Sequence, residues 1–161
     1  MGSIPEQSFK RLIIECSLIF LSPNRSCLVS KAELACSSSD FSIICTLLTK
    51  TGLIDDLNDG EWTIFAPKNA AFDDAPRSRG NTIGFVLEGH LVANSTITSE
   101  DLMCSEKTGM ANLRDTRTVC RNDQVFQKGA GNAADRRPEI VERDIKACNG
   151  IMHIINEVIL P

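Results

Sequence analysis

The chain has 161 residues and a formal net charge of −4, which comes from 17 basic and 21 acidic side chains. This length predicts one domain, and the acidic balance with scattered basic residues argues against a nucleic-acid partner. The absence of tyrosine and the single tryptophan leave little material for aromatic stacking platforms.

The cysteines and two glycosylation sequons point to an oxidising compartment. Seven cysteines are many for a reduced cytosolic protein, and none forms the Cys-x-x-Cys pair that is typical of zinc sites and thioredoxin-like couples. Disulfides are therefore their expected use. Asn-x-Ser/Thr triplets occur at Asn24 and Asn94, which are the expected glycosylation sites. We expect an extracellular or cell-surface protein.

Residues 1–39 form a predicted leader. Its apolar run, Leu12 to Leu21, follows two basic residues, is interrupted by Glu15, and is too short to span a bilayer. The run has the length and basic flank of a signal peptide's hydrophobic segment, but no clean small-x-small cleavage site follows it before Ala35. A signal or anchor remnant and a structured leader both remain open.

An amphipathic helix of about three turns is predicted after Asp40, which stands at the position of its N-cap. The Thr51-Gly52 pair is expected to end this helix. A short helical turn over residues 53–57 and a polar turn at 58–60 then lead to the next strand. The apolar residues at helical spacing in the first helix are Phe41, Ile44, Leu47 and Leu48.

The stretch from Trp62 to Phe72 predicts a strand that stops at a proline and continues into a capped helical turn. Residues 62–65 are all strand formers, and Pro67 removes a donor from the hydrogen-bond ladder. Asn69 can accept hydrogen bonds from the free amides of the turn that follows it. That turn would swing Phe72 back against the strand.

Loops, one more helix and several strands are predicted beyond Phe72. The polar residues 73–81 predict a surface loop, and apolar residues at helical spacing predict a helix from near Thr82 to Glu88. Residues 96–102 predict a strand that runs into a turn. A strand pair joined by the polar turn 121–123 is expected next.

The last third of the chain contains a glycine-rich loop and a hairpin signal. Residues 129–132, Gly-Ala-Gly-Asn, are flexible enough to cradle a ligand, but they lack the Lys-Ser/Thr of a phosphate-binding loop, so a turn is favoured. Asn149-Gly150 is a strong two-residue hairpin signal. The closing strand is expected from Ile151 to Leu160.

Two distant stretches resemble the signatures of the fasciclin domain family. Residues 63–72, Thr-Ile-Phe-Ala-Pro-Lys-Asn-Ala-Ala-Phe, are similar to the first signature, Thr-Val-Phe-Ala-Pro-Thr-Asn-x-Ala-Phe, with Lys68 where threonine is commoner. The resemblance covers roughly residues 40–161, which we take as the domain, and includes His90. The residues that carry the first match are Thr63, Phe65, Ala66, Pro67, Asn69 and Phe72. Those that carry the second are Asn149, Gly150, His153, Ile155, Val158, Leu160 and Pro161.

This resemblance implies a mainly β fold with packed helices (α+β), in which seven or so strands form a wedge-shaped β-sandwich with helices on one side. It also implies a role in cell adhesion and in extracellular-matrix or cell-wall assembly, with cell-surface or matrix proteins or glycans as partners. The family carries a Tyr-His pair where this sequence has Gly89-His90, so no property of that tyrosine is carried over. The alternative is an extracellular domain that binds a small apolar or glycan ligand in a cleft, which an enclosed apolar pocket with convergent polar groups would favour.

No residue pattern indicates catalysis, a cofactor or a metal site. A zinc site or a Cys-His pair would have to use His90 or His153, and no local motif supports either. We therefore expect a protein that is not an enzyme. His153 is interpreted as a half-buried strand residue bonded to a neighbouring loop, while Asn69 and His90 are expected to hold the first signature against the helix near residues 82–88.

Four cysteines remain when the leader is set aside: Cys45, Cys104, Cys120 and Cys148. If the segment between Cys104 and Cys120 doubles back as a hairpin, their Cα atoms come within the roughly 4.4–6.8 Å that a disulfide needs. We expect this bridge, which leaves Cys45 and Cys148 as the second pair. Recognition is expected to use the polar loops around residues 73–81 and 94–101.

Overall fold

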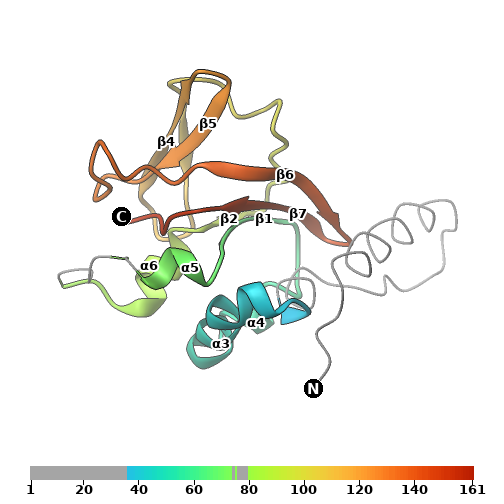
Figure 1. The fold of residues 1–161 in the computed structure, drawn as a ribbon. Coiled ribbons are helices and arrows are strands. Elements are labelled where there is room, and N and C mark those ends of the chain that lie inside the picture. The colour runs from blue at the N-terminus through green and yellow to red at the C-terminus, as the bar shows by residue number, and fades with distance from the viewer. Residues whose placement is uncertain (1–35, 74, 76–79) are drawn as a thin grey trace, which may run out of the picture.

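Two β-sheets and a group of helices form three layers (Figure 1). The computed structural model describes residues 36–73, 75 and 80–161. A four-stranded sheet lies in the middle, with the strand order β2-β1-β7-β6. A three-stranded sheet, β3-β4-β5, lies on one side of it, and α3 and α4 lie on the other (Figure 1). This arrangement agrees with the expected mainly β fold with helices packed on one side.

The elements have the following bounds. The strands are β1 (Trp62–Pro67), β2 (Leu91–Ala93), β3 (Lys107–Gly109), β4 (Asp115–Arg121), β5 (Gln124–Lys128), β6 (Ile140–Ala147) and β7 (Gly150–Ile155). The helices are η2 (Ser39–Phe41), α3 (Ser42–Thr51), α4 (Leu53–Asp56), α5 (Ala70–Asp73) and α6 (Ile83–Glu88). Within the described ranges, no helix has the length and apolarity needed to cross a membrane.

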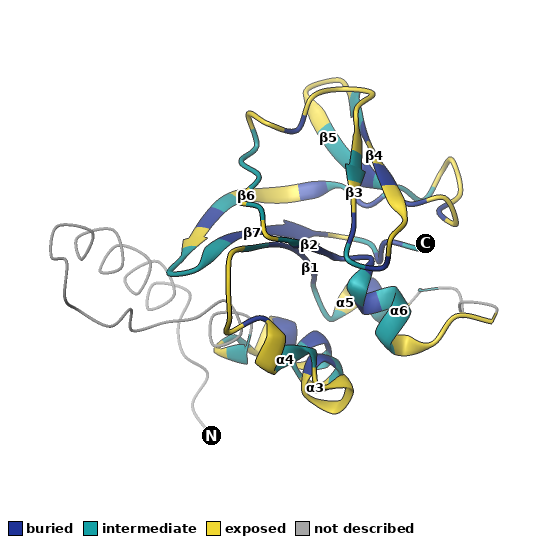
Figure 2. Ribbon diagram, turned by 180° about the vertical axis from the view of Figure 1, so that it is seen from behind, coloured by how far each residue is buried: buried dark blue, intermediate teal, exposed yellow. Residues whose placement is uncertain are grey.

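The two signatures form the centre of the fold, because β1 pairs with β7 in parallel, from Trp62 opposite Gly150 to Pro67 opposite Ile155. Both strands are buried along almost their whole length, as Figure 2 shows in dark blue. A strand that is covered on both faces needs a nearly continuous apolar sequence. Ile64 and Ala66 belong to a core cluster that includes residues of α3 and α6. Phe65 belongs to a second core cluster, on the side of the three-stranded sheet.

Several local predictions agree with the structure. The strand of the first signature ends at Pro67, one helical turn follows as α5, and α6 begins after Thr82, whose hydroxyl accepts a hydrogen bond from the Phe85 amide. The β4–β5 hairpin turns through Asn122 and Asp123, which both have positive φ values, of 47° and 63°. Positive φ at both central residues is what a tight two-residue hairpin requires.

Three expectations about element ends are wrong. Asp40 is not the cap of the first helix: it lies within η2, and α3 starts at Ser42. Residues 96–102 contain no strand, because side-chain hydrogen bonds hold this backbone in a turn at residues 98–101. The closing strand ends at Ile155 rather than Leu160, and the amides of Ile159 and Leu160 donate to side chains instead of a strand ladder.

The disulfides differ in part from the expected pairs. Cys104 and Cys120 are bonded, with their Cα atoms 5.5 Å apart. Cys45 is bonded to Cys36 rather than to Cys148, because the chain that enters α3 brings Cys36 to a Cα–Cα distance of 5.1 Å. Cys148 is also disulfide-bonded. The expected Cys45–Cys148 pair is therefore wrong, since Cys36 had been set aside with the leader.

Candidate functional site

Side chains from both signatures hold the loop from Asn94 to Asp101, called here the 94–101 loop. The Thr63 hydroxyl donates to the Ser95 carbonyl over 2.9 Å and accepts from the Ile97 amide over 2.8 Å. His153 is fully buried rather than half-buried as expected, and its Nε2 atom donates to the carbonyl of Ile97, in a neighbouring loop as expected, over 2.9 Å. Thr63 lies on β1 and His153 on β7, so the central strand pair fixes the path of this loop.

A carboxylate on β6 provides a second point of attachment. Asp144 has a φ of 58° and lies where the pairing of β6 with β7 shifts register, as in a β-bulge. Its carboxylate accepts from the Ser99 amide over 2.7 Å and from the Ser99 hydroxyl. The Asp144 amide donates to Nδ1 of His153 over 3.3 Å. The irregularity in β6 therefore aims Asp144 at the 94–101 loop.

Hydrogen bonds within the loop hold its C-terminal end in a turn. The Asp101 carboxylate accepts from the Thr98 hydroxyl over 2.6 Å and from the Thr98 amide over 2.9 Å. These hydrogen bonds lower the pKa of Asp101, the bond from the hydroxyl having the largest effect. Asn94, Thr96 and Glu100 are exposed. The 94–101 loop thus combines a fixed backbone with outward-facing polar side chains.

The two sequons fall in different parts of the chain. Asn94 is exposed, has a φ of 55°, and directly follows β2. An exposed asparagine at a loop is the setting that glycosylation requires. Asn24 lies outside the described residues. Glycosylation stays a prediction for both.

Ser99, Asp144 and His153 have the residue types of a hydrolytic triad but not its geometry. Such a triad needs a hydrogen bond between the nucleophile and the imidazole base. Here the Ser99 hydroxyl donates to Asp144, and Nε2 of His153 is bonded to a backbone carbonyl. The three side chains brace a loop. Nor does the described part of the chain contain a group of three or more His, Cys, Asp or Glu that could hold a metal ion.

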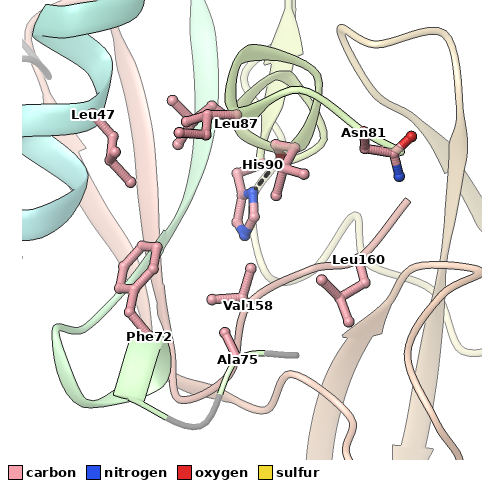
Figure 3. A pocket seen from close by; sticks show the side chains of 10 residues that line it. Leu47, Phe72, Ala75, Asn81, Leu87, His90, Val158 and Leu160 are labelled. Carbon is pink, nitrogen blue, oxygen red and sulfur yellow. Dashed lines mark hydrogen bonds between the residues drawn. The ribbon is translucent and has the colours of Figure 1, made fainter. Parts of the chain in front are cut away.

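His90 is buried between α6 and the C-terminal segment, residues 156–161 (Figure 3). Its Nδ1 donates to the Val86 carbonyl over 2.8 Å, and its Nε2 accepts from the Ile159 amide over 2.9 Å. Burial lowers the pKa of His90 to about 4, so the ring is neutral. The His90 carbonyl accepts from the Phe65 amide over 2.9 Å, which also links this residue to β1.

Asn69 attaches the first signature to the first main helix, not to the one near residues 82–88 as expected. Its Oδ1 accepts from the Ile43 amide over 3.0 Å, at the start of α3. Its Nδ2 donates to the Ser39 carbonyl over 2.8 Å and to the Ser42 hydroxyl over 2.9 Å. The cap that the sequence assigned to the turn after Asn69 therefore serves α3, and nothing local in the sequence indicates this.

The glycine-rich loop at residues 129–132 holds the chain's own C-terminal segment. The Asn132 Oδ1 accepts from the amides of Gly129 and Leu160, each over 3.0 Å, and its Nδ2 donates to the Val158 carbonyl over 2.9 Å. A Cβ atom at Gly129 would overlap the Leu160 carbonyl oxygen, so this close approach requires glycine. The turn was expected from the sequence, but its hydrogen bonds to the second signature were not.

The hairpin turn of the second signature is bonded to the start of the first. The Asn149 side chain donates to the Leu57 carbonyl over 2.7 Å. The Asn149 carbonyl accepts from the Trp62 amide over 3.1 Å. Through these two bonds Asn149 positions the entry to β1 beside Gly150.

An apolar pocket of about 330 Å³ opens beside His90 (Figure 3). Its walls come from α3, α5, α6 and the C-terminal segment. In Figure 3 the imidazole stands between Leu87 above and Val158 below, with Leu47 and Phe72 on one side and Leu160 on the other. Sequence patterns could not place this pocket, because its walls are contributed by residues as distant as Leu47 and Leu160.

Comparison with known proteins identifies the family. The fasciclin domain family matches residues 39–161. MPB70, an immunogenic protein of Mycobacterium bovis, is 29% identical over 113 residues, which are 70% of this chain and 56% of that protein. The uncharacterized protein sll1735 of Synechocystis is 30% identical over 144 residues, covering 80% of this chain and 95% of that protein. The transforming growth factor-beta-induced protein ig-h3 of Sus scrofa is 29% identical over 125 residues, covering 75% of this chain and 18% of that protein.

The fold is also similar to a solved structure. A FAS1 domain pair from the insect cell adhesion molecule Fasciclin I matches with a TM-score of 0.65 at 17% identity, over 83% of this chain and 51% of that one. The chain thus spans only about half the length of MPB70 and of this domain pair. The match to the family over residues 39–161, with both signatures paired at the centre of the fold, shows that the chain belongs to the fasciclin domain family.

Proposed function

We propose that this chain is a secreted or cell-surface interaction module for adhesion or extracellular-matrix assembly, without catalytic activity. Its fold is similar to that of a protein described as a cell adhesion molecule. The Cys36–Cys45 and Cys104–Cys120 bridges fit an oxidising, extracellular compartment. Cell-surface or matrix proteins or glycans are the proposed partners.

The main support for this proposal is the 94–101 loop, which has a fixed backbone and exposed polar side chains. Recognition residues are found more often on loops positioned by a rigid scaffold than on core strands. Thr63, His153 and Asp144 fix this loop from three strands, and its exposed polar side chains face solvent. A non-catalytic role is supported by the two histidines, since each has both ring nitrogens in hydrogen bonds within the fold.

The other proposed recognition segment is the stretch around residues 73–81. Asp73 is exposed at the end of α5, whereas residues 74 and 76–79 lie outside the described part of the chain. Its role stays a prediction. Within the 94–101 loop, Glu100 is the acidic residue to test, because Asp101 is bonded to Thr98 and its replacement would disturb the turn.

Charge reversal at Glu100 tests the proposal. The Glu100→Lys variant is expected to reduce attachment of cells, or of matrix extract, to a surface coated with the protein. The melting temperature should stay the same, since substitution of an exposed residue away from structural contacts usually changes stability little. Glu106→Lys is the matched control, because Glu106 is also exposed but lies next to β3, outside the loop. Equal attachment of Glu100→Lys, Glu106→Lys and the unmodified protein would show that recognition does not use this loop.

A further inference from the structure

The pocket beside His90 has the size and the walls of a small-molecule site. Its volume of about 330 Å³ falls within the range of about 300–1,000 Å³ that is typical of ligand pockets. An apolar cavity of about 150 Å³ accepts benzene, so this one has room for a molecule about twice as large. Leu47, Phe72, Val86, Leu87 and Leu160 are among the apolar residues that line it.

The chemistry of the walls restricts the ligand. None of the described residues that line the pocket is Asp, Glu, Lys or Arg, so a charged ligand would lose its hydration without gaining a counter-charge. His90 is the only titratable residue among them, and both of its ring nitrogens are already bonded to backbone groups. A glycan would also be a poor fit, because its hydroxyl groups need several polar partners, and among the described lining residues Asn81 alone has a side-chain amide.

The walls of the pocket come from segments that are far apart in the chain, so the pocket exists only in the folded protein. Leu160 and Val158 belong to the C-terminal segment, whereas Leu47 belongs to the first helix and Val86 to α6. A ligand that contacts all of these walls binds the folded chain and not the unfolded one. Such a ligand therefore raises the melting temperature, and the rise grows with the logarithm of the ligand concentration once the site is largely filled.

We propose that this pocket binds a small neutral apolar molecule, of the size of a bicyclic aromatic compound or a medium-chain aliphatic alcohol. This binding activity is separate from the recognition proposed for the 94–101 loop. The pocket and the loop lie on different elements, so either can fail its test without affecting the other.

Fluorescence titration with the neutral probe N-phenyl-1-naphthylamine tests this proposal on the full chain. We expect saturable binding at one site per chain. Decan-1-ol should displace the probe, while decanoate and decylammonium should not, because the described lining residues offer no partner for their charge. Absence of saturable probe binding, or displacement by decanoate as effective as that by decanol, would overturn the proposal.

A pair of tryptophan substitutions places the site. Leu47 and Leu53 are both partly buried and pack against the same core cluster, but only Leu47 lines the pocket. Leu47→Trp fills the cavity and is expected to weaken probe binding at least tenfold, whereas Leu53→Trp leaves it unchanged. If Leu47→Trp does not fold, Leu47→Phe fills less of the pocket and should weaken binding in the same direction. Equal probe affinity in a folded Leu47 variant and in Leu53→Trp would show that the probe binds elsewhere.

Discussion

The His90 and His153 regions use the same side chain in opposite ways. His90 donates from Nδ1 and accepts at Nε2, while His153 accepts at Nδ1 and donates from Nε2. In both, one nitrogen is bonded to a carbonyl and the other to an amide, so only a neutral ring satisfies both partners. Each histidine holds a segment without regular secondary structure: the C-terminal segment for His90 and the 94–101 loop for His153. In both regions, a neutral buried imidazole binds a backbone group of a segment that lies outside the β-strands.

The surroundings of the two rings differ in charge. Burial lowers the pKa of both. His90 has only backbone partners, whereas the Asp144 carboxylate acts against the lowering at His153 and Arg143 adds to it. Because burial acts on His90 without a nearby carboxylate, the His90 region should be the more sensitive of the two to acid and to substitution.

Alanine substitution of each histidine should give the largest effects. His90→Ala removes a buried ring and leaves the Ile159 amide without its partner, which should lower the free energy of unfolding by about 3–4 kcal/mol. Hydrogen exchange should rise first at Ile159 in this variant, and first at Asp144 in His153→Ala. The comparison fails if both variants lose protection at the same amides.

Acid should destabilise the protein through His90. Because the pKa of His90 is about 4 in the folded chain against 6.5 ordinarily, the unfolded state binds more protons between these two values. Stability therefore falls as the pH drops from 6.5 to 4, by about 3 kcal/mol in total for this group. Urea unfolding at pH 7 and pH 4.5 measures the loss. The His90→Gln variant should show a correspondingly smaller decrease, and an identical decrease in both proteins would contradict the assignment.

Asn69→Ala should have an intermediate effect. It removes the acceptor for the Ile43 amide and the donor to Ser39 and Ser42, which should cost about 1–2 kcal/mol. The control is Asn69→Asp, which keeps an acceptor at the start of α3 but loses the donors, so it should lose less stability. Chemical denaturation of the three proteins gives the order, and a neutral Asn69→Ala would show that the cap is dispensable.

Gly89→Ala should give the smallest effect. A Cβ atom at this position would lie 2.9 Å from Nδ2 of Asn112 and 3.0 Å from the Val86 carbonyl oxygen. The buried Asn112 amide, which donates to the Phe85 carbonyl, has to shift to make room, so the expected cost is about 1 kcal/mol. Adding Asn112→Ala to Gly89→Ala should cost less than the sum of the two single changes. Strict additivity in thermal unfolding would show that the two residues do not interfere.

The features that could be predicted from sequence are those set by neighbouring residues. The stop at Pro67, the helical turn before Phe72, and the hairpin at Asn122 and Asp123 each depend on a few adjacent side chains. The Cys104–Cys120 bridge follows from the same local logic, because its two cysteines flank one hairpin. Local pattern and fold agree at these positions.

The features that could not be predicted depend on residues far apart in the chain. Asn69 has the sequence context of a local cap, yet its partner amide is at Ile43. Gly129 and Asn132 resemble an ordinary turn until Leu160 is placed against them. Gly89 stood out as a departure from the family pattern, but its neighbour Asn112 becomes visible only in three dimensions. Periodicity carries no information about such contacts.

The parallel pairing of β1 with β7 also determines when this domain can fold during synthesis. The strand that begins at Trp62 has its central partner at Gly150, so β1 leaves the ribosome long before that partner exists. Until then, Ile64 and Phe65 lack the residues of β7 that pack beside them in the folded chain, and the loop closure between the two strands costs entropy that few local contacts offset. Folding should therefore be slow and should occur only after β7 has been made. A nascent chain that stalls between the two signatures would expose an apolar strand that is prone to aggregation.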